Sequence, residues 1–207
     1  MFYKSTNMSG RSMIEMLGVL AIIGVLSVGG IAAFTQMMAR QKISQTQTQI
    51  NAIAAKISAI GSEASSYSGL NNKTAVKFGA IPGEAVVDAA NGVLSNPFGG
   101  NITVSATDEA GDVMSYTITY TNLTKDACIF LATMDWGKRG SSFLKIALAN
   151  SGSNNSYVKD FTSTAEVNQV KDTYVVKSVQ YTPVAPADAA KGCSCTQQTC
   201  LIALKFN

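Results

Sequence analysis

Histidine is absent from this 207-residue sequence, and charged residues together make up only 14% of it. Histidine is the commonest general base and metal ligand, so most catalytic and metal-binding sites would lack their usual central residue. Basic residues occur mostly singly, and a net charge of +3 is too small and too scattered to indicate nucleic-acid binding. We therefore predict no enzyme activity, no cofactor, no metal and no nucleic-acid partner.

One acidic cluster, formed by Asp108, Glu109 and Asp112, comes nearest to a cation site. Calcium-binding loops of the EF-hand kind distribute their ligands over twelve residues, and this cluster lacks that pattern. Acidic residues around a glycine are more typical of a solvated turn. The cluster therefore predicts a turn between two strands.

Cysteine is scarce, and its four copies all lie outside the N-terminal apolar segment. Cys193, Cys195 and Cys200 crowd into the run CSCTQQTC, and Cys128 stands apart from them. Zinc sites made of cysteine thiolates prefer two-residue gaps within each pair, and this run does not have them. The N-terminal apolar segment, described below, would anchor an exported domain that contains all four cysteines, and export favours disulfide bonds over a thiolate metal site. The spacing leaves the pairing open.

The longest hydrophobic run extends from Gly10 to Phe34 and reads GRSMIEMLGVLAIIGVLSVGGIAAF. From Met13 onward it carries a single charge, Glu15, and no proline. A helix from Met13 to Phe34 would be roughly 33 Å long, enough to cross a bilayer core of about 30 Å. Residues 1–10 are polar and have no apolar core of their own, unlike a secretory signal peptide. The run therefore predicts a membrane-spanning helix that stays in the mature protein.

Glu15 is the unusual residue of this run. A carboxylate within a membrane helix costs about 2.5–3.5 kcal/mol on insertion scales. Its side chain could reach back to the headgroup region, since it is one turn from the helix start. Alternatively, it awaits a positive partner: a cut after Gly10 would create a new α-amino group, and the amine of a neighbouring chain could neutralise Glu15.

From Thr35 the apolar pattern narrows to one face of a helix. Isoleucines recur at spacings of seven, three, four and three residues, with glutamines around them. The pattern predicts one helix from Ser12 to about Ala64, roughly 80 Å long, whose second half packs on the protein's own C-terminal sheet. These isoleucines are Ile43, Ile50, Ile53, Ile57 and Ile60.

Residues 66–207 predict an α+β head. Alternating apolar residues on either side of the acidic turn predict a β-hairpin over 102–106 and 116–120. Within the connecting segment 66–100 we expect a short helix over 85–90 and a turn at NPFGG (Asn96–Gly100). Further on we expect helices over 124–134 and 163–170, the second with a capping box of Ser163 and Glu166, and strands over 174–181 and 201–206. A mostly antiparallel sheet lying on the long helix would give a lollipop shape.

The stretch Gly10-Arg11-Ser12-Met13-Ile14-Glu15-Met16-Leu17, followed by GVLAIIGVL, resembles the class III signal of type IV prepilins. The resemblance implies that a dedicated prepilin peptidase cuts after Gly10 and methylates the new amine of Arg11. It also places Glu15 at the fifth mature position, where the family has glutamate. The sequence departs from the family in one respect, because mature pilins usually start with an apolar residue and not with arginine.

The head is most similar to the larger type IVb pilins. The NPFGG turn, the pair Ala127-Cys128 at the start of a helix and a last cysteine before the final strand carry this similarity. It implies a disulfide from Cys128 to one of Cys193, Cys195 and Cys200, with the remaining two paired. The segments expected are a cytoplasmic leader (1–10), a transmembrane and polymerisation segment (11–34), the amphipathic half of the same helix (35–65) and the globular head (66–207).

The resemblance implies a pilin, a structural subunit that polymerises with other copies into a thin extracellular filament. Its partners would be other pilin subunits, the prepilin peptidase and the pilus assembly machinery of the inner membrane. The precursor would lie in the inner membrane with its N-terminus inside and its head in the periplasm. Two alternatives stay open: a pseudopilin of a type II secretion system, and a membrane-anchored exported binding module.

Overall fold

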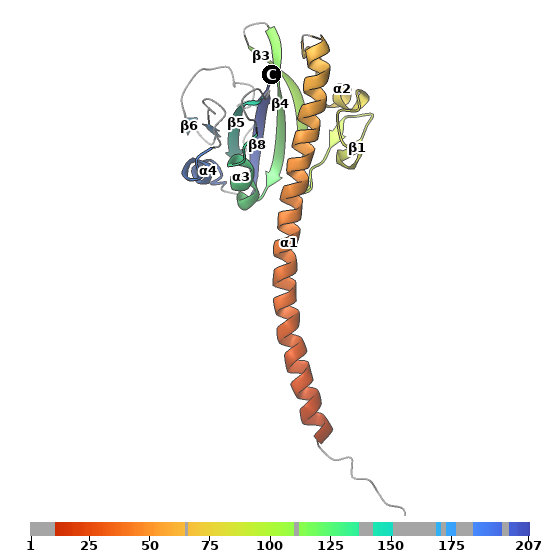
Figure 1. Cartoon of the computed structure of the whole chain (residues 1–207), viewed down its shortest axis with the longest axis vertical. Helices are drawn as coiled ribbons and strands as arrows, with labels where there is room; N and C mark the ends of the chain where they lie inside the picture. The colour runs from red at the N-terminus through yellow and green to blue at the C-terminus, as the bar shows by residue number, and fades with distance from the viewer. Residues whose placement is uncertain are drawn as a thin grey trace, which may run out of the picture. The chain divides into compact units, whose positions relative to one another are not determined.

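The computed structural model describes residues 11–64, 66–109, 112–136, 143–150, 169–170, 173–176, 184–195 and 199–207 (Figure 1). The leader, with Gly10, lies outside this set. The first element, α1 (Arg11–Ala64), is one helix of 54 residues, which confirms the predicted helix and its end near Ala64. The chain divides into two compact units, one ending at Gln41 and one running from Lys42 to Asn207, so α1 contributes to both.

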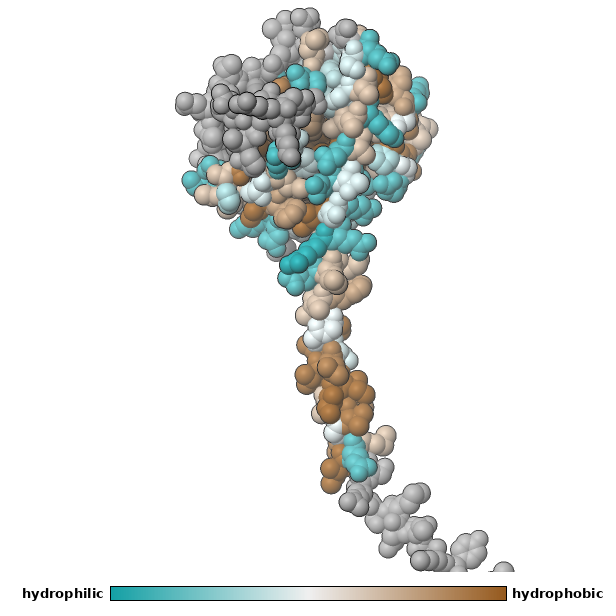
Figure 2. Space-filling view, in the orientation of Figure 1, coloured by the Kyte–Doolittle hydropathy of each residue, from teal (hydrophilic) through white to brown (hydrophobic). Residues whose placement is uncertain are grey.

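In the first unit, α1 exposes apolar side chains on all sides. Ile23, the best covered of the large apolar residues from Met13 to Phe34, is still 52% exposed. Figure 2 shows these side chains gathered along the helix. By length and composition α1 is able to cross a membrane.

In the second unit, α1 buries an apolar stripe. Ile50, Ile53 and Ile57 are almost fully buried in the core of the head, and Ile43 and Ile60 pack partly against it. The stripe predicted from the isoleucine spacing is therefore confirmed.

The head is built on a six-stranded sheet in which every pair of neighbouring strands is antiparallel. The last strand of the chain lies in the middle, between β4 and β5, and all seven of its residues are buried. The strands, in spatial order, are β3 (Ile102–Glu109), β4 (Asp112–Leu123), β8 (Cys200–Phe206), β5 (Phe143–Asn150), β7 (Thr173–Val176) and β6 (Gln169–Val170). The predicted hairpin is β3–β4, with Ile102 opposite Tyr120 and Ala106 opposite Tyr116.

Two short helices accompany the sheet. Helix α3 (Lys125–Ala132) begins at Thr124, whose Oγ1 accepts a hydrogen bond from the Ala127 amide, as expected for an N-cap threonine. Helix α4 (Pro186–Gly192) starts with a proline. Proline has no N–H, and a first turn tolerates it because an N–H at that position would have no partner within the helix. The predicted helix over 124–134 is confirmed in α3. Helix α4 was not predicted from the sequence.

The expected helix over 85–90 is wrong. After a 3₁₀ turn, η1 (Gly83–Ala85), the chain forms strand β1 (Val86–Asp88), which pairs with β2 (Val93–Leu94). Two consecutive valines favour the extended backbone. The Asp88 carboxylate then accepts hydrogen bonds from the Ala90 and Asn91 amides, which turns the chain.

Three other segments also differ from expectation or are only partly described. The connecting segment contains a helix, α2 (Asn72–Lys77), that the sequence did not indicate. The expected helix over 163–170 is wrong at its end, because 169–170 pair with β7 as strand β6. Ser163 and Glu166 lie outside the described residues. The expected strand over 174–181 appears as β7, and its second half also lies outside them.

Candidate functional site

The apolar surface of α1 in the first unit is the largest exposed hydrophobic feature among the residues that the structure describes. Val25, Val28 and Leu26 are 75%, 72% and 68% exposed, although full burial of such a side chain would contribute about 1.5–3 kcal/mol. Soluble monomers rarely expose a contiguous apolar surface of this extent. The helix therefore requires cover from outside the head, from lipid or from other helices.

Four glycines make this surface uneven. A Cβ atom added at Gly18, Gly24, Gly29 or Gly30 would meet no atom within 4 Å. The fold of the single chain therefore does not need a glycine at any of them. Small residues on membrane-type helices allow the backbone of another helix to approach closely. The glycines fit a surface that other helices cover.

Glu15 is the single charged residue on α1 between Met13 and Phe34, and its side chain is exposed. It lies four residues after Arg11, where α1 begins, so roughly 6 Å along the helix axis separates the two positions. The carboxylate is therefore about one helical turn from the start of α1. Its role in assembly stays a prediction.

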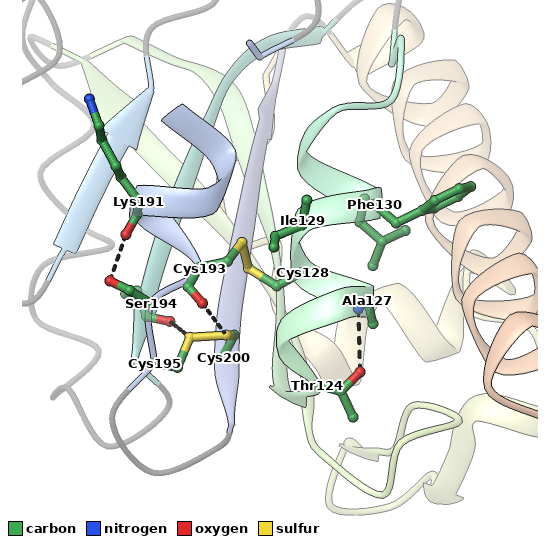
Figure 3. Close-up of a disulfide and its surroundings, with 12 residues drawn as sticks. Thr124, Ala127, Cys128, Ile129, Phe130, Lys191, Cys193, Ser194, Cys195 and Cys200 are labelled. Atoms are coloured by element: carbon green, nitrogen blue, oxygen red, sulfur yellow. Dashed lines mark hydrogen bonds between the residues drawn. A yellow bond between two sulfur atoms is a disulfide. The ribbon is translucent and has the colours of Figure 1, made fainter. Parts of the chain in front are cut away.

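Two disulfide bonds hold the C-terminal part of the head (Figure 3). Cys128 in the first turn of α3 is joined to Cys193, directly after α4, and Cys195 is joined to Cys200 at the start of β8. The structure thus selects one of the three partners that the sequence left open for Cys128. All four cysteines are thus paired in disulfides.

The first disulfide closes a long loop. Its two cysteines are 65 residues apart, and in the chain-entropy model such a loop stabilises the folded state by about 4 kcal/mol. Both sulfurs are fully buried. The bridge ties α3 to the residue that follows α4.

The NPFGG turn holds the start of β3 beside the end of β4. The Asn96 side chain accepts hydrogen bonds from the Phe98 and Gly100 amides and donates one to the Thr121 carbonyl at 2.8 Å. Gly100 lies so close to that carbonyl that any side chain would collide with it. The Lys42 ammonium lies 5.8 Å from the centre of the Phe98 ring, within cation–π range. The turn was predicted from sequence, but the contact with Lys42 was not, because no local pattern links residues so far apart.

Comparison with known proteins identifies the family. A sequence model of the family described as PilS N terminal matches residues 40–182, which is more than half of the chain. The chain belongs to this pilin family. A pilin is a structural protein and not an enzyme, so the family agrees with the expected absence of catalytic activity. The predicted resemblance to type IV pilins is thereby confirmed.

The chain is also similar to individual proteins. The chain is 27% identical over 190 residues to the major structural subunit of bundle-forming pilus from Escherichia coli O127:H6, covering 92% of this chain and 90% of the relative. It is 26% identical, with the same coverage, to the corresponding subunit of Escherichia coli O111:H-. It is also similar to the crystal structure of a type IV b pilin from Salmonella typhi, at 21% identity and a TM-score of 0.49, covering 79% of this chain and 97% of that one.

Proposed function

We propose that this pilin polymerises as a structural subunit of a type IVb pilus. The observation that carries the proposal is the apolar surface of α1 from Met13 to Phe34, which the head leaves exposed in a chain of the pilin family. Relatives that match nine-tenths of the chain are major pilus subunits, which supports a polymer of identical copies. In such a polymer, lateral contact between α1 helices would replace contact with lipid.

The precursor would be processed at its N-terminus. A prepilin peptidase would cut between Gly10 and Arg11 and methylate the Arg11 amine, as the class III signal around them implies. Before assembly, residues 11–34 would anchor the chain in the inner membrane, with the head in the periplasm. After assembly by the inner-membrane pilus machinery, the same residues would form the filament core and the head, 66–207, its extracellular surface.

Glu15 would pair with the N-terminal amine of a neighbouring subunit. A carboxylate removed from water is strongly destabilising when unpaired, and an opposite charge in contact offsets that cost. Since subunits with a misplaced amine would leave Glu15 unpaired, the pair would also fix the axial register of adjacent helices. A contact of this kind is heterologous: each subunit uses its amine on one neighbour and its carboxylate on another, which produces an open helical polymer.

The decisive test is the intact mass of the protein taken from its own cells and from cells that lack their prepilin peptidase. We expect the wild-type protein to lack residues 1–10 and to carry a methyl group, and to appear in filaments sheared from the cell surface. The peptidase-deficient cells should hold the full-length chain in the membrane fraction. Full-length protein in both strains, with none in the sheared fraction, would contradict the proposal. A processed protein that stays with the envelope would instead favour a pseudopilin.

A further inference from the structure

An apolar pocket of about 290 Å³ opens beside the C-terminal end of α1. Ile57 and Ile60 of α1 form one wall, and Tyr67, Leu70, Phe78 and Ala80 form the others. Phe78 directly follows α2, and its side chain is 62% exposed. An apolar pocket of this size, beside an exposed aromatic ring, can accept a further apolar side chain.

The helix that borders this pocket is basic. Lys73 and Lys77 are exposed on α2, and no acidic residue lies between Asn72 and Lys77. Lys73 acts on the nearby Asp88 carboxylate and helps to hold its pKa below the usual range, after the hydrogen bonds from Asn91. Lys77, which is exposed, directly precedes Phe78 in the pocket wall and is the positive charge that we assign to the edge of the pocket.

On a different part of the head, α3 presents the complementary pair of side chains. Phe130 is 51% exposed, although its neighbours Cys128 and Leu131 are fully buried. Figure 3 shows its ring extending from α3 on the side away from Cys193. Asp126 lies one turn earlier and is also exposed, and residues four apart share a helix face. This face of α3 therefore combines an aromatic side chain with a carboxylate.

The two features lie on opposite sides of α1. Helix α2 contacts β3, the edge strand, whereas α3 contacts β8 and β5 further across the sheet. Figure 1 shows α2 and α3 on either side of the upper part of α1. A chain therefore cannot bring its own Phe130 to its own pocket. A contact between the two must join different copies and leaves one pocket and one Phe130 unused at the ends of a row.

We propose that Phe130 of one subunit seats in the pocket between Tyr67 and Phe78 of the next, with Asp126 facing Lys77. This inference rests on the proposed function and names a head-to-head contact of the filament. Aromatic side chains in desolvated pockets are the usual energetic centres of protein interfaces. The opposite charges at the rim would favour this orientation, because like charges placed against each other oppose association. Since the contact is heterologous, it repeats without closing.

A photo-crosslinking amino acid in place of Phe130 tests the contact in intact filaments. We would use full-length protein in its own cells, shear the filaments, irradiate them and map crosslinked peptides by mass spectrometry. The expected product joins position 130 of one copy to the segment 57–80 of another. The same amino acid in place of Val87, an apolar residue that is 66% exposed on β1, is the matched control and should give several-fold less of this product.

A charge exchange tests the same contact with Phe130 intact. Asp126→Lys and Lys77→Asp should each lower the yield of sheared filaments several-fold, and the double variant should restore most of it. Filaments whose crosslinks map elsewhere, or a double variant no better than either single one, would overturn the inference and leave the proposed function intact. If the unmodified protein forms no filaments, the proposed function itself fails.

Discussion

Both parts of α1 carry large apolar side chains, but these side chains have opposite surroundings. Between Met13 and Phe34 the large apolar side chains are more than half exposed, whereas Ile50, Ile53 and Ile57 are almost completely buried in the head. The same helix thus contains one segment whose burial is complete within the single chain and one whose burial requires other molecules. The difference separates residues that decide folding from residues that decide assembly.

This separation makes the chain easy to dissect by mutation. A change in the segment 13–34 should leave the head folded and alter anchoring or polymerisation. A change in the buried stripe should lower the stability of the head.

The largest effect is expected for Glu15→Ala. Without the carboxylate, the amine of the incoming subunit would be buried without a partner, so the variant should not enter filaments on its own. The head should remain as stable as in the wild type, because Glu15 belongs to the unit that ends at Gln41 and not to the unit that contains the head. The amount of the variant in the sheared fraction, compared with the membrane fraction, measures the effect.

Glu63→Ala is the matched control, since Glu63 is an exposed carboxylate on α1 near its C-terminal end. It should assemble normally. If Glu15→Ala formed filaments in normal amounts, the pairing of Glu15 with an amine would be wrong.

The next largest effect concerns the disulfide bonds. Replacing Cys128 and Cys193 by serine should lower the free energy of unfolding by about 4 kcal/mol, since a 65-residue constraint on the unfolded chain is lost. Replacing Cys195 and Cys200, which are five residues apart, should cost only about 2 kcal/mol in the same chain-entropy model. Urea unfolding of the full chain in detergent compares the two variants. Equal losses would show that loop length does not govern the stabilisation here.

A pair of isoleucine substitutions tests the central comparison directly. Ile53→Ala should destabilise the head by about 2–5 kcal/mol, because it leaves a cavity in the core. Ile22→Ala removes the same atoms from a side chain that is 62% exposed, and should leave the unfolding of the head unchanged. A loss of head stability in Ile22→Ala would show that the two segments of α1 are not separable.

Much of this fold was predictable because its signals are local. The isoleucine spacing predicted the buried face of α1, alternation predicted the β3–β4 hairpin, and Thr124 marked the start of α3. The short helix over 85–90 was wrong because alanines on both sides concealed two valines in a strand that pairs with β2. Strand pairing depends on a partner elsewhere in the chain, and no local propensity contains that information.

Some features of the candidate site were likewise predictable from local sequence, and others were not. The apolar run and Glu15 were visible because a charge inside such a run is rare. The partner of Cys128 was not, since Cys193, Cys195 and Cys200 lie within eight residues of one another and only α4 decides which of them reaches α3. The pocket beside Tyr67 was also not predictable, because its walls come from α1, the following loop and α2.

A smaller effect is expected for Tyr116→Phe. The Tyr116 hydroxyl donates a hydrogen bond to the Ala54 carbonyl at 2.9 Å and lies 2.8 Å from the Ser58 hydroxyl, so it ties β4 to the buried stretch of α1. Removing it should cost about 1 kcal/mol or somewhat more, the usual range for a buried hydrogen bond. Thermal unfolding of the full chain in detergent would detect the loss. An unchanged midpoint would mean that the bond contributes nothing net.

Tyr120 lies four residues after Tyr116 on the same face of β4. Tyr120→Phe should have the smallest effect on stability, with the opposite sign. The Tyr120 hydroxyl is buried and is one of the two buried side-chain atoms without a hydrogen-bond partner among the described residues. Removing a buried polar group that has no partner is neutral or stabilising. At neutral pH we therefore expect Tyr120→Phe to unfold at the same denaturant concentration as the wild type or at a higher one.

The stabilities of the wild type and of Tyr120→Phe should differ more at alkaline pH. Burial, and then the charge of Glu84, raise the pKa of Tyr120 above its ordinary value of 10.0. Below pH 10 both the folded and the unfolded chain keep the proton, so stability does not depend on it. Above pH 10 the unfolded chain releases the proton more readily, and the stability of the wild type falls as the pH rises. Tyr120→Phe should show a shallower fall between pH 10 and 12, with a remainder from Tyr67, whose pKa burial also raises. Equal slopes in the two proteins would show that the Tyr120 hydroxyl reaches water.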